Sequence, residues 1–283
     1  MSRSGFCLLA LAALPCLAAI TDQQCTDLLQ HALSSSNPDT RKMAVVALSL
    51  AAADGTLFGQ LQSMLHDKDV EVRLAVIAGL QELKTKPAII ALHTALEDTA
   101  PEVSFAAAKA LWALDDSAGE QALLAVLAGE SKTSSNFFTK ETRQAIRMMH
   151  TPRTTFLYAV RQGVGFAPVP GLGMGISSMQ QILTDPGVSG RAAAALLVGR
   201  DTDAATTTAL KDALYDKDWR VRAAAVHSLA LRNDPKLRPD LEPMFEDDKE
   251  EVRLRAAAGL LRLSAVEAKG SAKPRSKAAT KKK

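Results

Sequence analysis

The chain has 283 residues, a formal net charge of +3, three cysteines and only 12 aromatic residues. Alanine supplies 49 positions, about one in six, whereas the strands of β-sandwiches and barrels need aromatic and β-branched side chains. The composition therefore argues against those folds, and three cysteines exclude a dense disulfide scaffold.

The first 19 residues have the pattern of a secretory signal peptide. Arg3 precedes an apolar run from Phe6 to Leu17, and the small residues Ala18 and Ala19 follow. Cleavage is acceptable after either alanine. The run is shorter than the 20 or so apolar residues that are needed to span a bilayer. The alternatives to a cleaved signal peptide are a buried first helix and an uncleaved anchor. We predict export to the periplasm or the extracellular space, where the chain can stay associated with the envelope.

Cleavage leaves Cys25 as the one cysteine, either buried on a helix face or paired with another chain.

Most of the remaining chain repeats one pattern about every 31 residues. The pattern is a Leu, an Asp two residues later, Val-Arg at the seventh and eighth positions after the Leu, and then small and apolar residues. Copies start at Leu33, Leu65, Leu96, Leu183, Leu214 and Phe245, and a degenerate copy lies near Ser135. A fixed period of this length indicates an array of structural repeats.

Each copy predicts two helices joined by a polar turn. In the second copy we expect helices over 56–65 and 69–83, the latter with a helical stripe of apolar residues from Val72 to Leu83. The turn Asp can cap the amides that open the second helix, and alanine favours helix and lets neighbouring helices approach closely. One hairpin cannot bury its apolar face alone. We therefore predict an all-α superhelix, or solenoid, of about seven hairpins that stack on their neighbours.

These residues resemble HEAT repeats, specifically the short alanine-rich type called phycobilin-lyase HEAT-like repeats. The resemblance covers about residues 22–264, as copies 1–4 (20–150) and copies 5–7 (176–264). It implies a right-handed superhelix with a ladder in which the turn Asp of one copy pairs with the helix Arg of another. Asp67, Asp98, Asp185, Asp216 and Asp247 match the Asp position, and Arg41, Arg73, Arg143, Arg191, Arg222 and Arg253 match the Arg position. Ser104 replaces the Arg of the third copy. As exposed pairs they would contribute about 0–1 kcal/mol each and set the register more than the stability.

An apolar insert rich in Gly and Pro, residues 151–175, interrupts the array. The 23 residues from Gln162 to Thr184 carry no charge, and five glycines and two prolines among them prevent a continuous helix. These residues argue against a membrane span, and the lack of a preceding strand and of a following Gly-Lys-Ser/Thr argues against a nucleotide loop. Two interpretations remain: a loop folded back onto the solenoid, or a loop that contacts a partner. The candidate partner contacts are Phe166, Val169, Leu172 and Met174.

Nothing in the sequence predicts catalytic chemistry. None of the five histidines is followed by Glu or spaced for a shared helical metal site, and no motif for a catalytic serine, a Cys-x-x-Cys pair or zinc is present. We predict no enzymatic activity, no metal, no cofactor and no small-molecule substrate. The alternative is an enzyme-associated role like that of bilin lyases or of deoxyhypusine hydroxylase, which share the repeat architecture. The hydroxylase holds two irons through His-Glu steps that this chain lacks.

Residues 265–283 form a basic C-terminal segment. The last 16 residues contribute +7, which leaves −4 on the other 267. Because small residues and lysines cannot bury a core, we predict a disordered tail. Its candidate anion-binding residues are Lys269, Lys273, Arg275, Lys277, Lys281, Lys282 and Lys283. The tail is either a solubilising appendage or a tether to an anionic membrane surface. Without interleaved aromatic residues it offers no base-stacking platform, so we expect no nucleic-acid partner.

Together these features predict an exported, non-catalytic scaffold that binds a protein partner. A peripheral membrane-binding protein, attached through the uncharged loop, is a second alternative.

Overall fold

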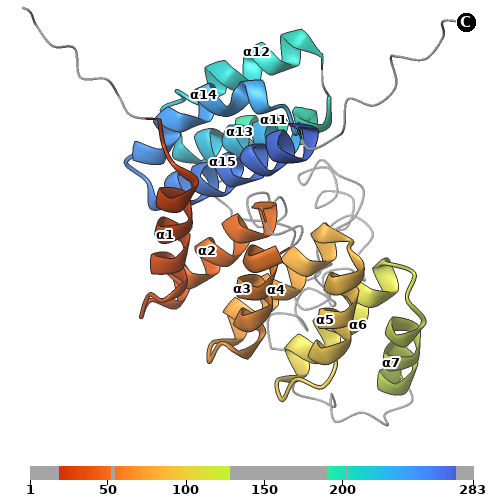
Figure 1. Ribbon diagram of the computed structural model, residues 1–283. Helices are drawn as coiled ribbons and strands as arrows, with labels where there is room; N and C mark the ends of the chain where they lie inside the picture. The colour runs from red at the N-terminus through yellow and green to blue at the C-terminus, as the bar shows by residue number, and fades with distance from the viewer. Residues whose placement is uncertain (1–18, 52–54, 128–189, 202, 272–283) are drawn as a thin grey trace, which may run out of the picture.

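The computed structural model describes residues 19–51, 55–127, 190–201 and 203–271. Within these ranges all regular structure is helical, which confirms the all-α fold (Figure 1). Before the long gap lie α1 (Asp22–Leu33), α2 (Pro38–Ala51), α3 (Gly55–Ser63), η1 (Met64–His66), α4 (Val70–Leu83), α5 (Lys86–Ala95), α6 (Pro101–Ala113) and α7 (Ser117–Leu127). After it lie α11 (Gly190–Leu197), η2 (Val198–Arg200), α12 (Ala204–Ala213), α13 (Trp219–Leu231), η3 (Pro235–Leu237), α14 (Arg238–Leu241), η4 (Glu242–Glu246) and α15 (Glu250–Ser271).

The second copy illustrates how the local sequence sets each hairpin. Its first helix, α3, tightens into the 3-10 turn η1, and its second helix, α4, begins one residue later than predicted. The side chain of Asp69 caps α4 by accepting from the backbone N–H of Glu71 at 2.9 Å and of Val72 at 3.3 Å. These bonds satisfy amides that have no partner inside the helix. At the other end Lys84 adopts a left-handed conformation, with φ of 52°, and terminates α4.

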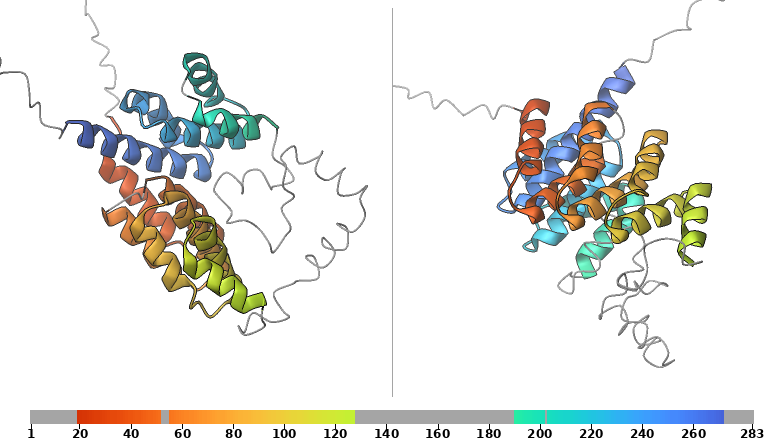
Figure 2. Two further views of the ribbon diagram at one scale, coloured as in Figure 1. Left: turned by 90° about the vertical axis from the view of Figure 1, so that its right-hand side faces the viewer. Right: turned by 90° about the horizontal axis from the view of Figure 1, so that it is seen from below.

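The copies stack as sequence neighbours except at one junction, where the seventh copy lies against the first. The second helices of the hairpins pack side by side in the order α11, α13, α15, α2, α4, α6. The seventh copy therefore lies next to the first, and α15 also packs along α1. Figures 1 and 2 show the blue α15 beside the red α1 from several directions. Our expectation that copies stack as sequence neighbours is wrong at this point, because α15 covers the face of the first copy that no preceding copy could cover.

Small residues let the second helices approach closely. The close pairs are Gly79 with Ser49, Gly259 with Ala230, and Gly199 with Ser228. A Cβ added at Gly79 would lie 2.8 Å from the Cβ of Ser49, closer than two carbon atoms can pack. The high alanine and glycine content therefore serves helix-to-helix contact between copies as well as helix formation.

Polar contacts fasten the first copy to the seventh. Ser264 Oγ donates to Asp22 Oδ1 at 2.8 Å, and Arg238 lies 3.3 Å from the same carboxylate. At the far end of α2, Arg262 donates to the carbonyl oxygen of Leu50 at 2.6 Å. These contacts join residues more than 200 positions apart in the chain, so the two ends of the sequence form one packed unit.

Helix α15 continues through Ser271. The predicted start of a disordered tail at residue 265 is therefore wrong for residues 265–271, where helix-forming residues extend α15 beyond the packed region into solvent. Residues 272–283 of that tail, residues 1–18 of the predicted signal peptide and the whole insert 151–175 lie outside the described residues.

Candidate functional site

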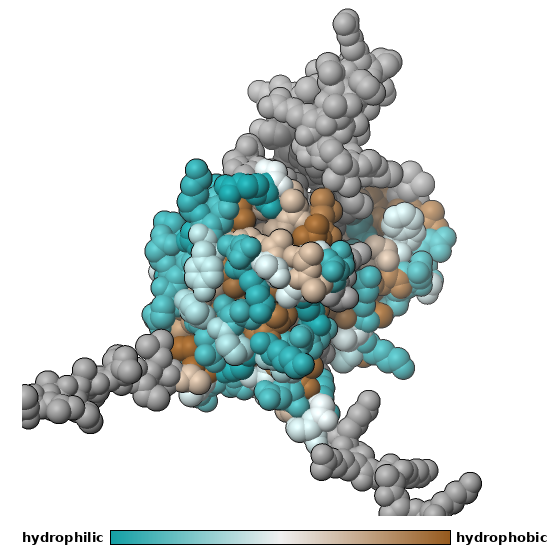
Figure 3. Space-filling view, turned by 90° about the horizontal axis from the view of Figure 1, so that it is seen from above, coloured by the Kyte–Doolittle hydropathy of each residue, from teal (hydrophilic) through white to brown (hydrophobic). Residues whose placement is uncertain are grey.

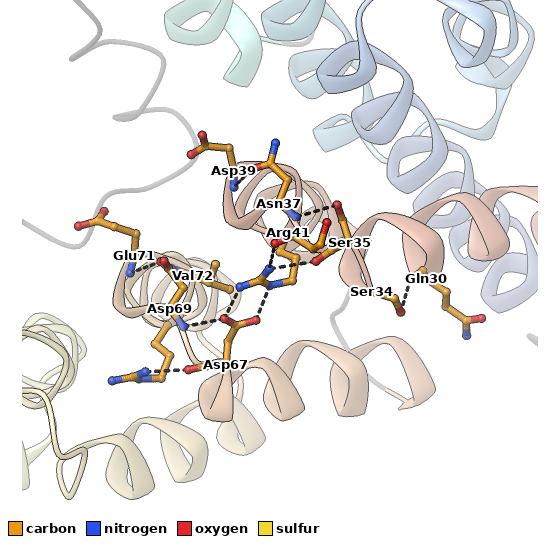
Figure 4. A network of polar contacts seen from close by, with 12 residues as sticks. Gln30, Ser34, Ser35, Asn37, Asp39, Arg41, Asp67, Asp69, Glu71 and Val72 are labelled. Carbon is orange, nitrogen blue, oxygen red and sulfur yellow. Dashed lines mark hydrogen bonds and ion pairs between the residues drawn. The ribbon is translucent and has the colours of Figure 1, made fainter.

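Arginine–aspartate pairs connect consecutive copies along the stack. Arg41 binds Asp67 through two parallel hydrogen bonds, from Nε to Oδ2 at 2.7 Å and from Nη2 to Oδ1 at 2.8 Å (Figure 4). The same two-bond arrangement joins Arg73 to Asp98 at 2.8 and 3.0 Å, and Arg222 to Asp247 at 2.7 and 2.8 Å. Arg191 pairs with Asp216 through Nη1. In all four pairs the aspartate belongs to the following copy.

Most of these pairs are buried, which differs from the exposed ladder that the sequence suggested. The side chains of Arg41 and Asp67 are 6% and 8% exposed, whereas that of Arg191 is 54% exposed. The hydrogen bonds from Arg41 hold the pKa of the Asp67 carboxyl below its usual range. Removing one partner of a buried pair leaves an uncompensated charge and costs about 3–5 kcal/mol, so the buried pairs matter for stability as well as register.

The turn of each copy fixes both partners of the ladder. Asp67 Oδ1 also accepts from the backbone N–H of Asp69 at 2.8 Å. Arg73 in turn donates from Nη1 to the carbonyl oxygen of Asp67 at 2.7 Å, and Arg222 and Arg253 make the equivalent bond within their own copies. In Arg73 and Arg222 this bond leaves the Nε–Nη2 edge directed along the stack, toward the aspartate of the next copy.

The ladder is interrupted where the seventh copy meets the first. Ser35 occupies the Asp position of the first copy: its Oγ accepts from the N–H of Asn37 at 3.2 Å, and its carbonyl oxygen accepts from Arg41 at 2.9 Å. Arg253 keeps the bond from Nη1 to the carbonyl oxygen of Asp247 at 2.8 Å. In the part of the chain that the structure describes, no carboxylate pairs with Arg253.

The remaining ladder positions divide into two groups. Asp185 and Arg143 lie outside the described residues. Ser104 donates from Oγ to the carbonyl oxygen of Leu96 at 2.6 Å instead of forming an ion pair. No sequence pattern indicated the 3.1 Å contact between His93, in the last turn of α5, and Asp116, in the turn before α7.

A buried basic cluster lies where α13, α15 and α2 meet. His227 and Arg255 are 5% and 2% exposed. Burial, together with the charges of Arg255 and Arg262, lowers the pKa of His227 to about 3, so its ring is neutral at physiological pH. Arg255 Nη1 pairs with Glu251 at 2.5 Å, while its Nε is buried without a hydrogen-bond partner. His227 lies on α13, and Glu251, Arg255 and Arg262 lie on α15, so the packing of these two helices brings the cluster together; no sequence motif indicated it.

Cys25 is buried on α1, which confirms the prediction of a small residue on a helix face. Burial raises the pKa of its thiol to about 12, so the thiol stays protonated and unreactive.

Large apolar side chains are exposed on the two outermost copies at each end of the described stack, the third and fourth copies at one end and the fifth and sixth at the other, which we call the end copies. They are Ile90, Trp112, Leu124, Leu197, Val198, Tyr215 and Leu231. Trp112 and Tyr215 expose 60% and 70% of their surface. The face that Figure 3 shows carries hydrophobic residues scattered among hydrophilic ones. The candidate contacts Phe166, Val169, Leu172 and Met174 lie outside the described residues.

The described part of the basic segment ends within α15. Lys269 lies in its exposed last turn, and the other six candidate anion-binding residues fall beyond Ser271. Among the described helices none is long and apolar enough to cross a membrane. The same residues contain no group of three or more His, Cys, Asp or Glu side chains that could hold a metal ion.

Comparison with known proteins agrees with the repeat architecture. The family model for HEAT repeats matches residues 60–136 and 176–262, which together make up more than half of the chain. No curated protein shows a significant match. The periodic hairpins, their stacking and this match lead to one conclusion: the chain belongs to the HEAT repeat family.

Proposed function

We propose that this protein is an exported, non-catalytic scaffold that binds a protein partner. HEAT repeats generally mediate protein–protein interactions. The observation that carries the proposal is the exposure of large apolar side chains on the end copies, led by Trp112 and Tyr215. Tryptophan and tyrosine are enriched in the energetic centres of protein interfaces, because they bury a large area at little cost in conformational entropy.

Site-specific photo-crosslinking tests the scaffold. A photoreactive residue at Trp112 or Tyr215 should give a crosslinked species in the native host, whereas the same residue at the exposed polar position Gln62 should not. Equal crosslinking at all three positions, or none at the apolar ones, would refute a partner surface on the end copies.

Export is proposed from the pattern of residues 1–19. Amino-terminal sequencing of the protein from its native host should give a mature chain that begins at Ala19 or Ile20. A chain that retains residue 1 and stays in the cytoplasm contradicts it.

The basic tail is proposed as a tether to anionic surfaces. Binding to vesicles of anionic lipid should weaken as salt rises, because salt screens the lysine charges. A chain ending at Ser271 removes residues 272–283 without cutting α15 and is the matched control. Equal binding by both chains would show that the tail is a solubilising appendage.

The contact-loop hypothesis for residues 151–175 has its own test. Replacing Phe166, Val169, Leu172 and Met174 together with serine should abolish partner crosslinking and leave the helical circular dichroism unchanged. Retained crosslinking favours the packed-down loop.

Two alternatives to the scaffold function are each tested by a measurement of their own. An enzyme-associated role like that of the hydroxylase or of the bilin lyases, whose repeat type this chain resembles, requires stoichiometric iron or a bound bilin in the purified protein. Peripheral membrane binding through the uncharged loop requires the mature protein to sediment with membranes without its tail.

A further inference from the structure

Arg253 makes the same turn bond as the ladder arginines but has no acidic partner among the described residues. In the pairs of Arg41, Arg73 and Arg222, the Nε–Nη2 edge binds both carboxylate oxygens of an aspartate in the next copy. Arg253 is oriented by the same bond from Nη1 to a turn carbonyl, at 2.8 Å. Its Nε–Nη2 edge is the one that elsewhere receives a carboxylate.

Ser35 explains why this edge has no partner. The first copy follows the seventh in the stack, through the packing of α2 against α15. Ser35 reproduces the two backbone roles of the ladder aspartate, since its Oγ caps Asn37 and its carbonyl oxygen binds Arg41. A serine side chain is shorter and uncharged, so it supplies the cap but no carboxylate for Arg253.

The edge is accessible to a ligand. Arg253 is half-buried, and its unpaired nitrogens are not fully enclosed. By contrast, Nε of the neighbouring Arg255 is fully enclosed and has no hydrogen-bond partner. An arginine held in a fixed orientation loses less conformational entropy on pairing than one on a free surface.

The shape of the edge favours a carboxylate. Two parallel N–H donors in one plane match the two oxygens of a carboxylate bidentately, as they do in the ladder pairs.

We propose that Arg253, at the junction of the seventh and first copies, is a docking point for an aspartate or glutamate side chain of a partner polypeptide. The partner inserts its carboxylate where Ser35 leaves the ladder incomplete and so continues the series of pairs across the junction. This inference rests on the proposed scaffold function for its biological role, but its chemistry can be measured on the purified protein alone.

The test follows the Nε–Hε signal of Arg253 by nuclear magnetic resonance in the full-length chain. The probe is a capped glycine peptide with one central glutamate, and the matched control peptide carries glutamine. Arg253→Gln assigns the signal by its loss. We expect a saturable shift with the glutamate peptide and none with the glutamine peptide. No shift with the glutamate peptide, or equal shifts with both, would overturn the proposal.

Ser35→Asp supplies the missing carboxylate from within the chain. It should move the Arg253 signal before any peptide is added, weaken peptide binding at least tenfold, and raise the melting temperature. The rise should vanish when Arg253→Gln is added. If Ser35→Asp leaves the signal, the affinity and the melting temperature unchanged, Ser35 does not face Arg253 and the proposal is wrong.

Inorganic phosphate is the second ligand. If phosphate shifts the Arg253 signal at lower concentrations than the glutamate peptide does, the preferred partner is a phosphorylated polypeptide and the proposal of an acidic side chain is wrong. If crosslinking at Trp112 fails but the glutamate peptide shifts the Arg253 signal, the carboxylate site is retained and only the partner surface on the end copies is rejected.

Discussion

Acid should destabilise this protein through His227. Its folded-state pKa of about 3 lies below the value of about 6.5 expected in the unfolded chain, because burial and two nearby arginines disfavour the charged ring. The neutral ring is therefore fully compatible with the fold above pH 6.5. Below that pH the unfolded chain binds a proton that the folded chain does not, so the free energy of unfolding falls by about 1.4 kcal/mol per pH unit.

Between pH 7 and pH 5 the loss amounts to about 2 kcal/mol, a large part of the 5–15 kcal/mol typical of folded domains. Urea unfolding at pH 7, 6 and 5, followed by circular dichroism, measures it. The side chain introduced by His227→Gln cannot titrate. Between pH 7 and pH 5 the free energy of unfolding of this variant should therefore fall by about 2 kcal/mol less than that of the wild type, whatever the stability of the variant at pH 7.

The matched control is His66→Gln, which alters an exposed histidine at the end of η1. This variant should keep the pH dependence of the wild-type protein between pH 7 and pH 5. If wild type and His227→Gln lose stability in parallel over this range, the buried ring is not the group that titrates, and the reasoning from its surroundings fails.

Two further substitutions test the packing and the ladder. Gly79→Ala should destabilise the fold by about 1–2 kcal/mol, because the new Cβ would lie 2.8 Å from a side chain of the neighbouring helix. Gly59→Ala in α3 has open space around the new Cβ and should stabilise the fold by about 0.5–1 kcal/mol. Thermal melts in which Gly59→Ala is the less stable of the two variants would contradict the close approach at Gly79. Arg73→Gln should cost about 3 kcal/mol because it leaves Asp98 nearly buried without its cation, while Arg191→Gln, at a half-exposed site, should cost less than about 1 kcal/mol. Equal losses in urea unfolding would show that burial of the pair does not set its contribution.

The helices could be predicted from the sequence because each is determined locally. The spacing of apolar residues and the turn aspartates placed the helices of the second copy within about two residues of their observed ends. The extension of α15 to Ser271 was missed because the lysines and small residues near its end resemble a disordered tail, although alanine and glutamate there can extend an existing helix.

The packing of the seventh copy against the first could not be predicted in the same way. Every second helix presents a similar surface of alanines and aliphatic residues, so the pattern does not specify which copy stacks on which. One signal was present: Arg253 matches the ladder in the last copy, and Ser35 lacks the acid in the first. The buried cluster around His227 forms where α13 packs against α15, and no spacing along the chain indicated that its members meet.

The position of α15 between α13 and α2 also has a consequence for biosynthesis. The first copy is synthesised before the other described copies, yet α15, which covers it, is synthesised after all the other described helices, and bonds such as Ser264 to Asp22 span 242 residues. Contacts of such long sequence separation slow folding, because the chain must close a large loop before they form. Until the last helix is available, α1 and α2 expose apolar surface that a chaperone can bind. Nascent chains should therefore remain sensitive to protease within α1 and α2 until α15 has left the ribosome.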